Sequence, residues 1–390
     1  MTTAPVFPAP GTGKAPHLYS VDVVRILTFA CMIGVHVTSH TSSDTDLPLN
    51  TLLGLLHFTR EVFFALSAFV LVLSYLYRPR PMRAFLPKRF LLVGVPYMVW
   101  SVIYFIALLI RYPTHMSVWG NIGYFFVVLV TGQAWYHLYF LLVTMQVYLL
   151  LPTILWLIRR TRGHHLLLLA GAAVFQLSLM AYYMYGRHIP HWIAGSEKVV
   201  FLSYVFVILL GAVTADHAAS VFGWVTTHRG TIAWIVAGTG ALTLGVFAIQ
   251  HWVFGMSLYK SGTPLQPIIV IWGVAVALGF LGFGSWWAER RQEGSLSART
   301  VAFASDISFG VYLVHPLVLW ILLSVGPGSH DWVPELIPSP WLTIVTYAVV
   351  VAVSVGFVAV ARRTPLSLPL AGRRRRRPVA PSPESSGQQV

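Results

Sequence analysis

The chain has 390 residues and a formal net charge of +14, with 56% hydrophobic and only 10% charged side chains. Soluble domains average about 25% charged residues, so this composition excludes an ordinary soluble protein. The basic residues sit in short segments between apolar runs and in the C-terminal tail, a pattern that sets membrane orientation and argues against a nucleic-acid partner.

The chain opens on a polar, Pro-rich segment, residues 1–18, without the apolar core of a removable signal peptide. Apolar runs long enough to cross about 30 Å of hydrocarbon follow it. Ten candidate spans cover residues 20–38, 52–77, 90–111, 137–157, 165–184, 199–215, 231–252, 266–286, 305–325 and 340–361. We therefore predict an all-α polytopic membrane helix bundle over residues 19–362, embedded in the lipid bilayer of a cell (plasma) membrane.

An eleventh apolar run, residues 121–131, is too short for a crossing and fits a re-entrant or interfacial segment. With ten spans and a cytoplasmic N-terminus, twenty of the 26 Lys and Arg residues fall on the cytoplasmic side. An eleventh crossing would place Arg159, Arg160 and Arg162 outside, against the positive-inside rule. Both termini are thus predicted to be cytoplasmic, and residues 363–390, basic and then Pro/Ser-rich, are predicted to form a disordered tail.

The first span carries Asp22, Arg25 and His36. Charged groups inside a bilayer are costly, so each is a functional candidate. Arg25 and His36 are eleven residues apart, share one helix face and lie about 16 Å apart along the axis. The alternative is an interfacial Asp22–Arg25 ion pair, with Arg25 reaching the headgroups and His36 capping the outer end of the helix.

The second span carries His57, Arg60 and Glu61. His57 and Glu61 share a face, at a depth near that of His36, and a carboxylate beside an imidazole can fix its tautomer and raise its basicity. A Glu61 pair with Arg60 or His57 that only neutralises buried charge explains the same residues.

Two further histidines lie within predicted spans. His137 opens the fourth span, and His315 lies within the ninth, where a polar residue bonded across helices is the simplest explanation. His36 and His40 have the spacing of metal ligands, but no third ligand is clear, so we expect no metal.

Five motifs follow one another along the chain. They are Val21-Asp22-Val23-Val24-Arg25 with His36; Glu61-Val62-Phe63-Phe64-Ala65-Leu66-Ser67-Ala68-Phe69; Lys88-Arg89 with Pro96-Tyr97; His137-Leu138-Tyr139-Phe140; and Ile307-Ser308-Phe309-Gly310-Val311-Tyr312-Leu313-Val314-His315-Pro316. Together they resemble the acyltransferase-3 family of integral membrane O-acyltransferases, over about residues 17–360.

The resemblance implies transfer of an acyl group, usually acetyl, from cytoplasmic acyl-CoA to a hydroxyl of a carbohydrate or glycosylated acceptor, with no permanently bound cofactor. It also implies that Arg25 and His36 are essential, and it carries the acidic position of the second motif over to Glu61.

Two positions depart from the family pattern. Ala68 stands where a glycine is frequent, a change that still allows close helix packing. Leu92 stands where a second arginine is frequent, so Arg83, Lys88 or Arg89 would have to hold the donor instead.

We expect the phosphates of acyl-CoA to be drawn to the basic segment before the third span, although membrane orientation alone also explains that segment. His36, oriented by Glu61, would take the proton of the acceptor hydroxyl or carry the acyl group covalently.

Three alternatives stay open: a small-molecule (antibiotic-type) acyltransferase with a cytoplasmic acceptor, a proton-coupled transporter, and a non-enzymatic scaffold. The lack of repeat-related halves argues against transport, and the five motifs argue against a scaffold.

Overall fold

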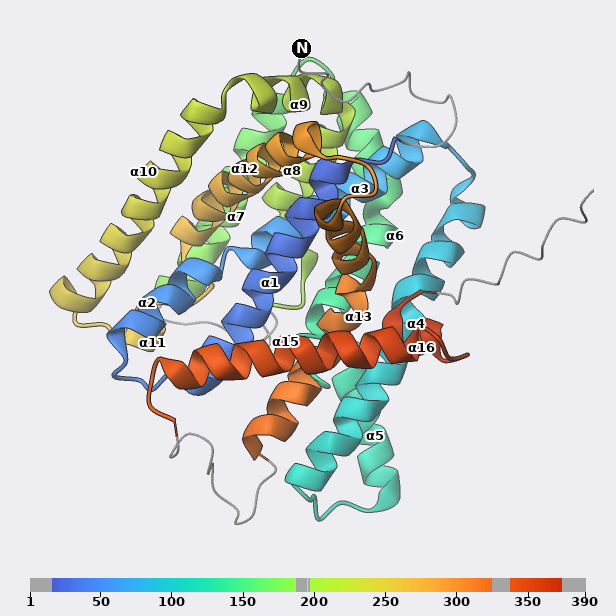
Figure 1. Ribbon diagram of the computed structural model, residues 1–390, viewed down its shortest axis with the longest axis vertical. Coiled ribbons are helices and arrows are strands. Elements are labelled where there is room, and N and C mark those ends of the chain that lie inside the picture. The colour runs from blue at the N-terminus through green and yellow to red at the C-terminus, as the bar shows by residue number, and fades with distance from the viewer. Residues whose placement is uncertain (1–15, 187–194, 196, 325–336, 374–390) are drawn as a thin grey trace, which may run out of the picture.

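The computed structural model describes residues 16–186, 195, 197–324 and 337–373 (Figure 1). Within these ranges every regular element is a helix, which confirms the predicted all-α class. The elements are α1 (Tyr19–Thr41), α2 (Leu47–Leu56), α3 (Thr59–Tyr77), α4 (Met82–Arg111), α5 (Val118–Val130), α6 (Tyr139–Arg160), α7 (His165–Tyr185), η1 (Phe201–Tyr204), α8 (Val205–Asp216), α9 (Ala218–Thr227), α10 (Arg229–Ala248), η2 (Ile249–Val253), α11 (Leu258–Ser261), α12 (Pro267–Arg290), α13 (Leu296–Ser324), α15 (Trp341–Ala361) and α16 (Ser367–Ala371).

Among the described residues, nine helical stretches are long and apolar enough to cross a bilayer. Helices α2 and α3 form one of them, and α10 with η2 forms another. A tenth crossing results if the bent pair Phe201–Asp216 and Ala218–Thr227 is one broken span. Helix α5 has 13 residues and a length of about 20 Å, too short to cross, as predicted for 121–131.

The sixth predicted span differs from the straight helix expected over 199–215. The apolar run ends at the polar pair Asp216-His217, and the chain turns there by 93° into α9, which lies between the predicted spans 199–215 and 231–252. In Figure 1, α9 lies across the end of the bundle at which α1 begins.

The two predicted tails are described only in part. Residues 1–15 and 374–390, which include most of both, lie outside the described residues. The disorder predicted for 363–390 does not extend to α16, whose Ser367 and Ala371 are buried against the bundle. Helix α16 packs on α4, α13 and α15, as Figure 1 shows at the end of α15.

The arrangement of the helices places α1 in the interior. It packs between α12 and α13, while α3 packs along α8. The α3–α8 contact is so close that a Cβ added at Gly211 would lie 2.0 Å from the carbonyl oxygen of Ala65, so only glycine fits there. Ala68 of α3, at the position where a glycine is frequent, is also buried, with 1% of its surface exposed. Because α1 packs between α12 and α13, its polar residues face other helices.

Candidate active site

Arg25 is held between α1 and α13. Its Nη1 donates to Asp22 Oδ1 at 3.1 Å and to Ser305 Oγ at 2.9 Å. The Ser305 hydroxyl in turn donates to Asp22 Oδ1 at 2.7 Å, and His17 Nε2 lies 2.6 Å from Asp22 Oδ2. The Asp22–Arg25 ion pair, which the sequence left as the alternative, is thus formed, and Ser305 of α13 fixes its geometry.

The Arg25 side chain lines a cavity of about 250 Å³, which we call the arginine cavity. Its other charged lining residues are Arg89, Asp306 and Arg373. Three of the four lining charges are positive, so the cavity suits a multiply charged anion.

The three residues expected to hold the donor are separated by the structure. Arg89 lines the arginine cavity, where its Nη2 donates to Ser74 Oγ at 2.7 Å and its guanidinium lies over the Phe85 ring. Arg83 and Lys88 are exposed on the first turns of α4 and lie outside the cavity lining. The three residues lie within two turns of one helix, and their spacing alone could not show which of them faces the cavity.

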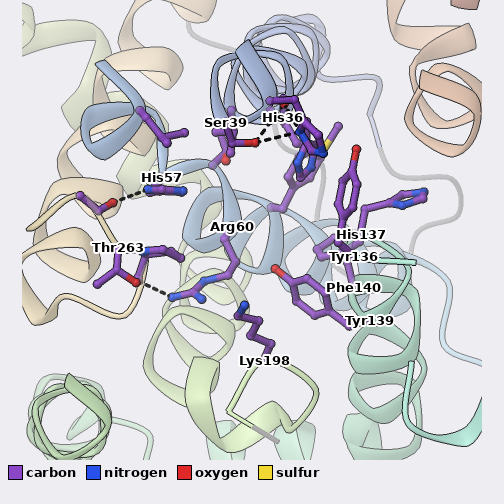
Figure 2. A pocket seen from close by; sticks show the side chains of 18 of the residues that line it. His36, Ser39, His57, Arg60, Tyr136, His137, Tyr139, Phe140, Lys198 and Thr263 are labelled. Atoms are coloured by element: carbon purple, nitrogen blue, oxygen red, sulfur yellow. Dashed lines mark hydrogen bonds between the residues drawn. The ribbon is translucent and has the colours of Figure 1, made fainter. Parts of the chain in front are cut away.

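His36 lines a second cavity, of about 340 Å³, which we call the histidine cavity. In Figure 2, His36 lies beside Tyr136 and His137, across the cavity from His57 and Thr263. The His36 ring centroid is 4.8 Å from that of Tyr136. Helix α1 therefore presents Arg25 to one cavity and His36 to the other.

Two more imidazoles gather at His36. His315 stacks on His36 with ring centroids 5.4 Å apart, and His137 lies 5.7 Å from His315. His315 Nδ1 donates to the Val311 carbonyl at 3.1 Å, which leaves its buried Nε2 without a partner among the described residues. Both ring nitrogens of His137 are likewise buried and unpartnered within the described chain. Proton-accepting nitrogens thus concentrate at this place.

The contact expected between Glu61 and His36 is not formed. Glu61 Oε1 accepts hydrogen bonds from Arg60 Nε at 3.3 Å and Nη2 at 3.1 Å, and Oε2 accepts one from Gln176 Nε2 at 3.2 Å. His57 also points elsewhere, because its Nδ1 donates to the Gly262 carbonyl at 2.7 Å. Glu61 faces α7 and neutralises Arg60, which is the alternative that the sequence left open.

An aromatic layer separates the two cavities. Phe63 and Phe140 line both of them, with ring centroids 5.2 Å apart. Phe29 extends the layer at 4.5 Å from Phe63, and Tyr312 extends it at 5.8 Å from Phe140. We call these four residues the aromatic partition. Its members come from four different helices, so the spacing of residues along the sequence could not predict it.

Potential metal ligands occur away from both cavities. His165, Asp216 and His217 bring three ligand atoms within 4.8 Å of one another, and none of the three lines either cavity. His165 Nδ1 and His217 Nε2 are 2.8 Å apart, a distance that a hydrogen bond between neutral rings explains.

Comparisons with known proteins identify the family. A family model described as an acyltransferase domain matches residues 18–360, which include both cavities except for Gly372 and Arg373. Searches of curated proteins and of solved structures each found no match. The matched range covers most of the chain and all of the nine candidate spans but the last residue of α15. The chain therefore belongs to the acyltransferase-3 family and is a multi-pass membrane acyltransferase.

Proposed function

We propose that the protein transfers an acyl group, specifically acetyl, from cytoplasmic acyl-CoA to a hydroxyl of a carbohydrate or glycosylated acceptor. The observation that carries the proposal is the pair of cavities on α1, one lined by Arg25 and the other by His36, which meet at the aromatic partition. Two cavities with different chemistry suit two substrates that meet at one point.

The arginine cavity suits the donor. Guanidinium groups bind phosphate oxygens with paired, charge-assisted hydrogen bonds, and CoA carries several phosphates. From the positive-inside rule we propose that this end of the bundle faces the cytoplasm and that acyl-CoA enters there. The thioester would then lie at the aromatic partition, beyond Arg25.

The histidine cavity suits a polyhydroxylated acceptor. It combines the rings of Tyr136 and Tyr259 with polar groups on Lys198 and Thr263. A neutral His36 imidazole would take the proton of the acceptor hydroxyl while its oxygen attacks the thioester carbonyl carbon. The carbon–sulfur bond then breaks, and the thiolate leaves as CoA. The same ring could instead accept the acyl group first and pass it to the hydroxyl in a second step.

The proposal is tested with purified protein in liposomes of one known orientation. Acetyl-CoA is supplied on the side of the N-terminus, a panel of glycans and glycosylated small molecules on the other side, and release of free CoA is measured. We expect release that depends on an acceptor on the side opposite the donor. Release only when donor and acceptor share one side would assign a cytoplasmic acceptor. Flux of protons and solute without any CoA release would overturn the enzymatic proposal.

The aromatic partition gives a second test. Phe140→Trp enlarges a ring that already lies 4.6 Å from Phe64 and 5.2 Å from Phe63, so it should narrow the route between the cavities. We expect kcat to fall at least about tenfold, because a displacement of about 1 Å at a reacting centre can cost 10²-fold in rate. Donor affinity should fall much less than kcat, because the arginine side chains that we propose to bind the phosphates are unchanged. Phe303→Trp, on an exposed position of α13, is the matched control. An unchanged kcat in Phe140→Trp would show that the acyl group does not pass this ring.

A further inference from the structure

We propose that Arg373 binds the phosphate-bearing part of the acyl donor, so that the segment after the last long helix is part of the donor site. The inference rests on the proposed function, because it takes acyl-CoA as the ligand of the arginine cavity. It adds a residue that lies beyond the range matched by the family model. Arg373 lines the same cavity as Arg25 and Arg89, although 348 positions separate it from Arg25 in the sequence.

The position of Arg373 is built by α16. This short helix buries Ser367 and Ala371 at 1% and 3% exposure, and the Trp100 indole of α4 donates to its Leu370 carbonyl at 3.3 Å. The Ser367 hydroxyl donates back to the Arg373 carbonyl at 2.5 Å. Helix α16 therefore holds the backbone of Arg373 at the cavity, although the side chain is half-exposed.

Gly372 directs the chain into the cavity. It ends α16 in the left-handed conformation, with φ of +67°, which glycine adopts without strain. A Cβ at this position would lie 2.1 Å from Cδ1 of the Phe309 ring. Only glycine fits both the backbone conformation and the close contact with Phe309, so the turn that delivers Arg373 is specific.

The charges around Arg373 leave one cation in excess. Asp306 pairs with Arg362 through Oδ2 and with Arg373 through Oδ1. One carboxylate facing two guanidiniums leaves a net positive charge, because Arg362 alone neutralises Asp306. Arg89, which lines the cavity from α4, hydrogen-bonds to a serine and has no carboxylate within ion-pair distance among the described residues. The cavity is thus lined by more guanidinium charge than its carboxylate neutralises, and this excess suits a phosphate group.

Leu92 is a second position in the arginine cavity at which a positive charge can be introduced when Arg373 is replaced. It lines the arginine cavity on α4, three residues after Arg89 and therefore on the same helix face. An arginine introduced at position 92 would extend from α4 into the same cavity that Arg373 lines from the end of α16.

The experiment measures the dissociation constants of acetyl-CoA and of acetyl-pantetheine, which lacks the nucleotide phosphates, for purified protein in detergent. We expect Arg373→Gln to weaken acetyl-CoA binding about tenfold, the low end for a charge-assisted bond because the side chain is half-exposed. Acetyl-pantetheine binding should not change. Arg363→Gln, an exposed arginine ten residues earlier, is the matched control. Leu92→Arg added to Arg373→Gln should recover most of the lost affinity, and melting temperatures confirm that each variant is folded.

The outcomes separate the two proposals. Equal acetyl-CoA affinity in wild type and Arg373→Gln would overturn the role of Arg373 and leave the proposed function in place. Equal weakening of both ligands would also overturn it, because the loss would not depend on the phosphates. No binding of acetyl-CoA by the wild type would instead overturn the proposed function. If Arg373→Gln does not fold, Arg373→Lys, which keeps the charge, is compared with Gly372→Ala, which should displace it.

Discussion

Replacement of His36 by alanine is expected to lower kcat for acyl transfer by about 10² to 10⁴-fold, the usual contribution of a general acid–base group. His36 is the residue of the histidine cavity that α1 places in line with Arg25, and its ring contacts the rings of Tyr136 and His315. Its removal should therefore take away the proton acceptor and leave the helix packing intact. Release of CoA under saturating donor and acceptor is the measurement, with a melting curve for each protein.

His40→Ala is the matched control for this prediction. His40 lies one turn further along α1, is exposed, and directs its Nδ1 to the His36 carbonyl at 2.8 Å. His40 also lines the histidine cavity, so its replacement can weaken acceptor binding, but kcat should stay near the wild-type value. Equal losses in the two variants would mean that the end of α1, and not the His36 imidazole, sets the rate. Full activity in His36→Ala would remove His36 from the chemistry.

Replacement of Glu61 by alanine is expected to destabilise the protein by about 3–5 kcal/mol, the cost of leaving a buried charge without its partner. The Glu61 and Arg60 side chains are 0% and 7% exposed, so water cannot compensate Arg60. The pair variant Arg60→Met/Glu61→Leu removes both charges and should recover most of that stability. Thermal unfolding in detergent compares the three proteins.

The pair variant also separates two roles of Glu61. The family resemblance makes this residue a candidate in the chemistry, whereas its hydrogen bonds go to Arg60 and Gln176 and away from His36. A folded pair variant that keeps its activity would assign Glu61 to charge neutralisation alone. A pair variant as unstable as Glu61→Ala would contradict the proposed coupling between the two side chains.

The helices were predictable because each apolar run has to satisfy its own backbone hydrogen bonds in a bilayer. Nine of the ten predicted spans appear as long apolar helices, and the tenth appears as the bent pair. The bend itself was not predicted. Hydropathy predicts the length of the apolar segment before Asp216, but it does not predict the direction of the chain after His217.

The site was predictable only within single helices. Helical spacing placed Arg25 and His36 on one face, and the structure directs them to two adjoining cavities. The same kind of reasoning paired Glu61 with His36 across two helices, which failed because side-chain direction between helices depends on packing. His137 and His315 were visible as motif residues, but only the fold brings them together beside His36.

The contact between Gly211 and Ala65 has a mechanical consequence for substrate exchange. With backbone against backbone, α3 and α8 have no layer of side chains on which to slide, so the two helices should move as one rigid body. Phe63 belongs to α3 and is the stationary half of the aromatic partition, whereas Phe140 belongs to α6, which no glycine contact of this kind joins to another helix among the described residues. We therefore expect the passage for the acyl group to open by rotation of Phe140, with α3 and α8 serving as the fixed frame.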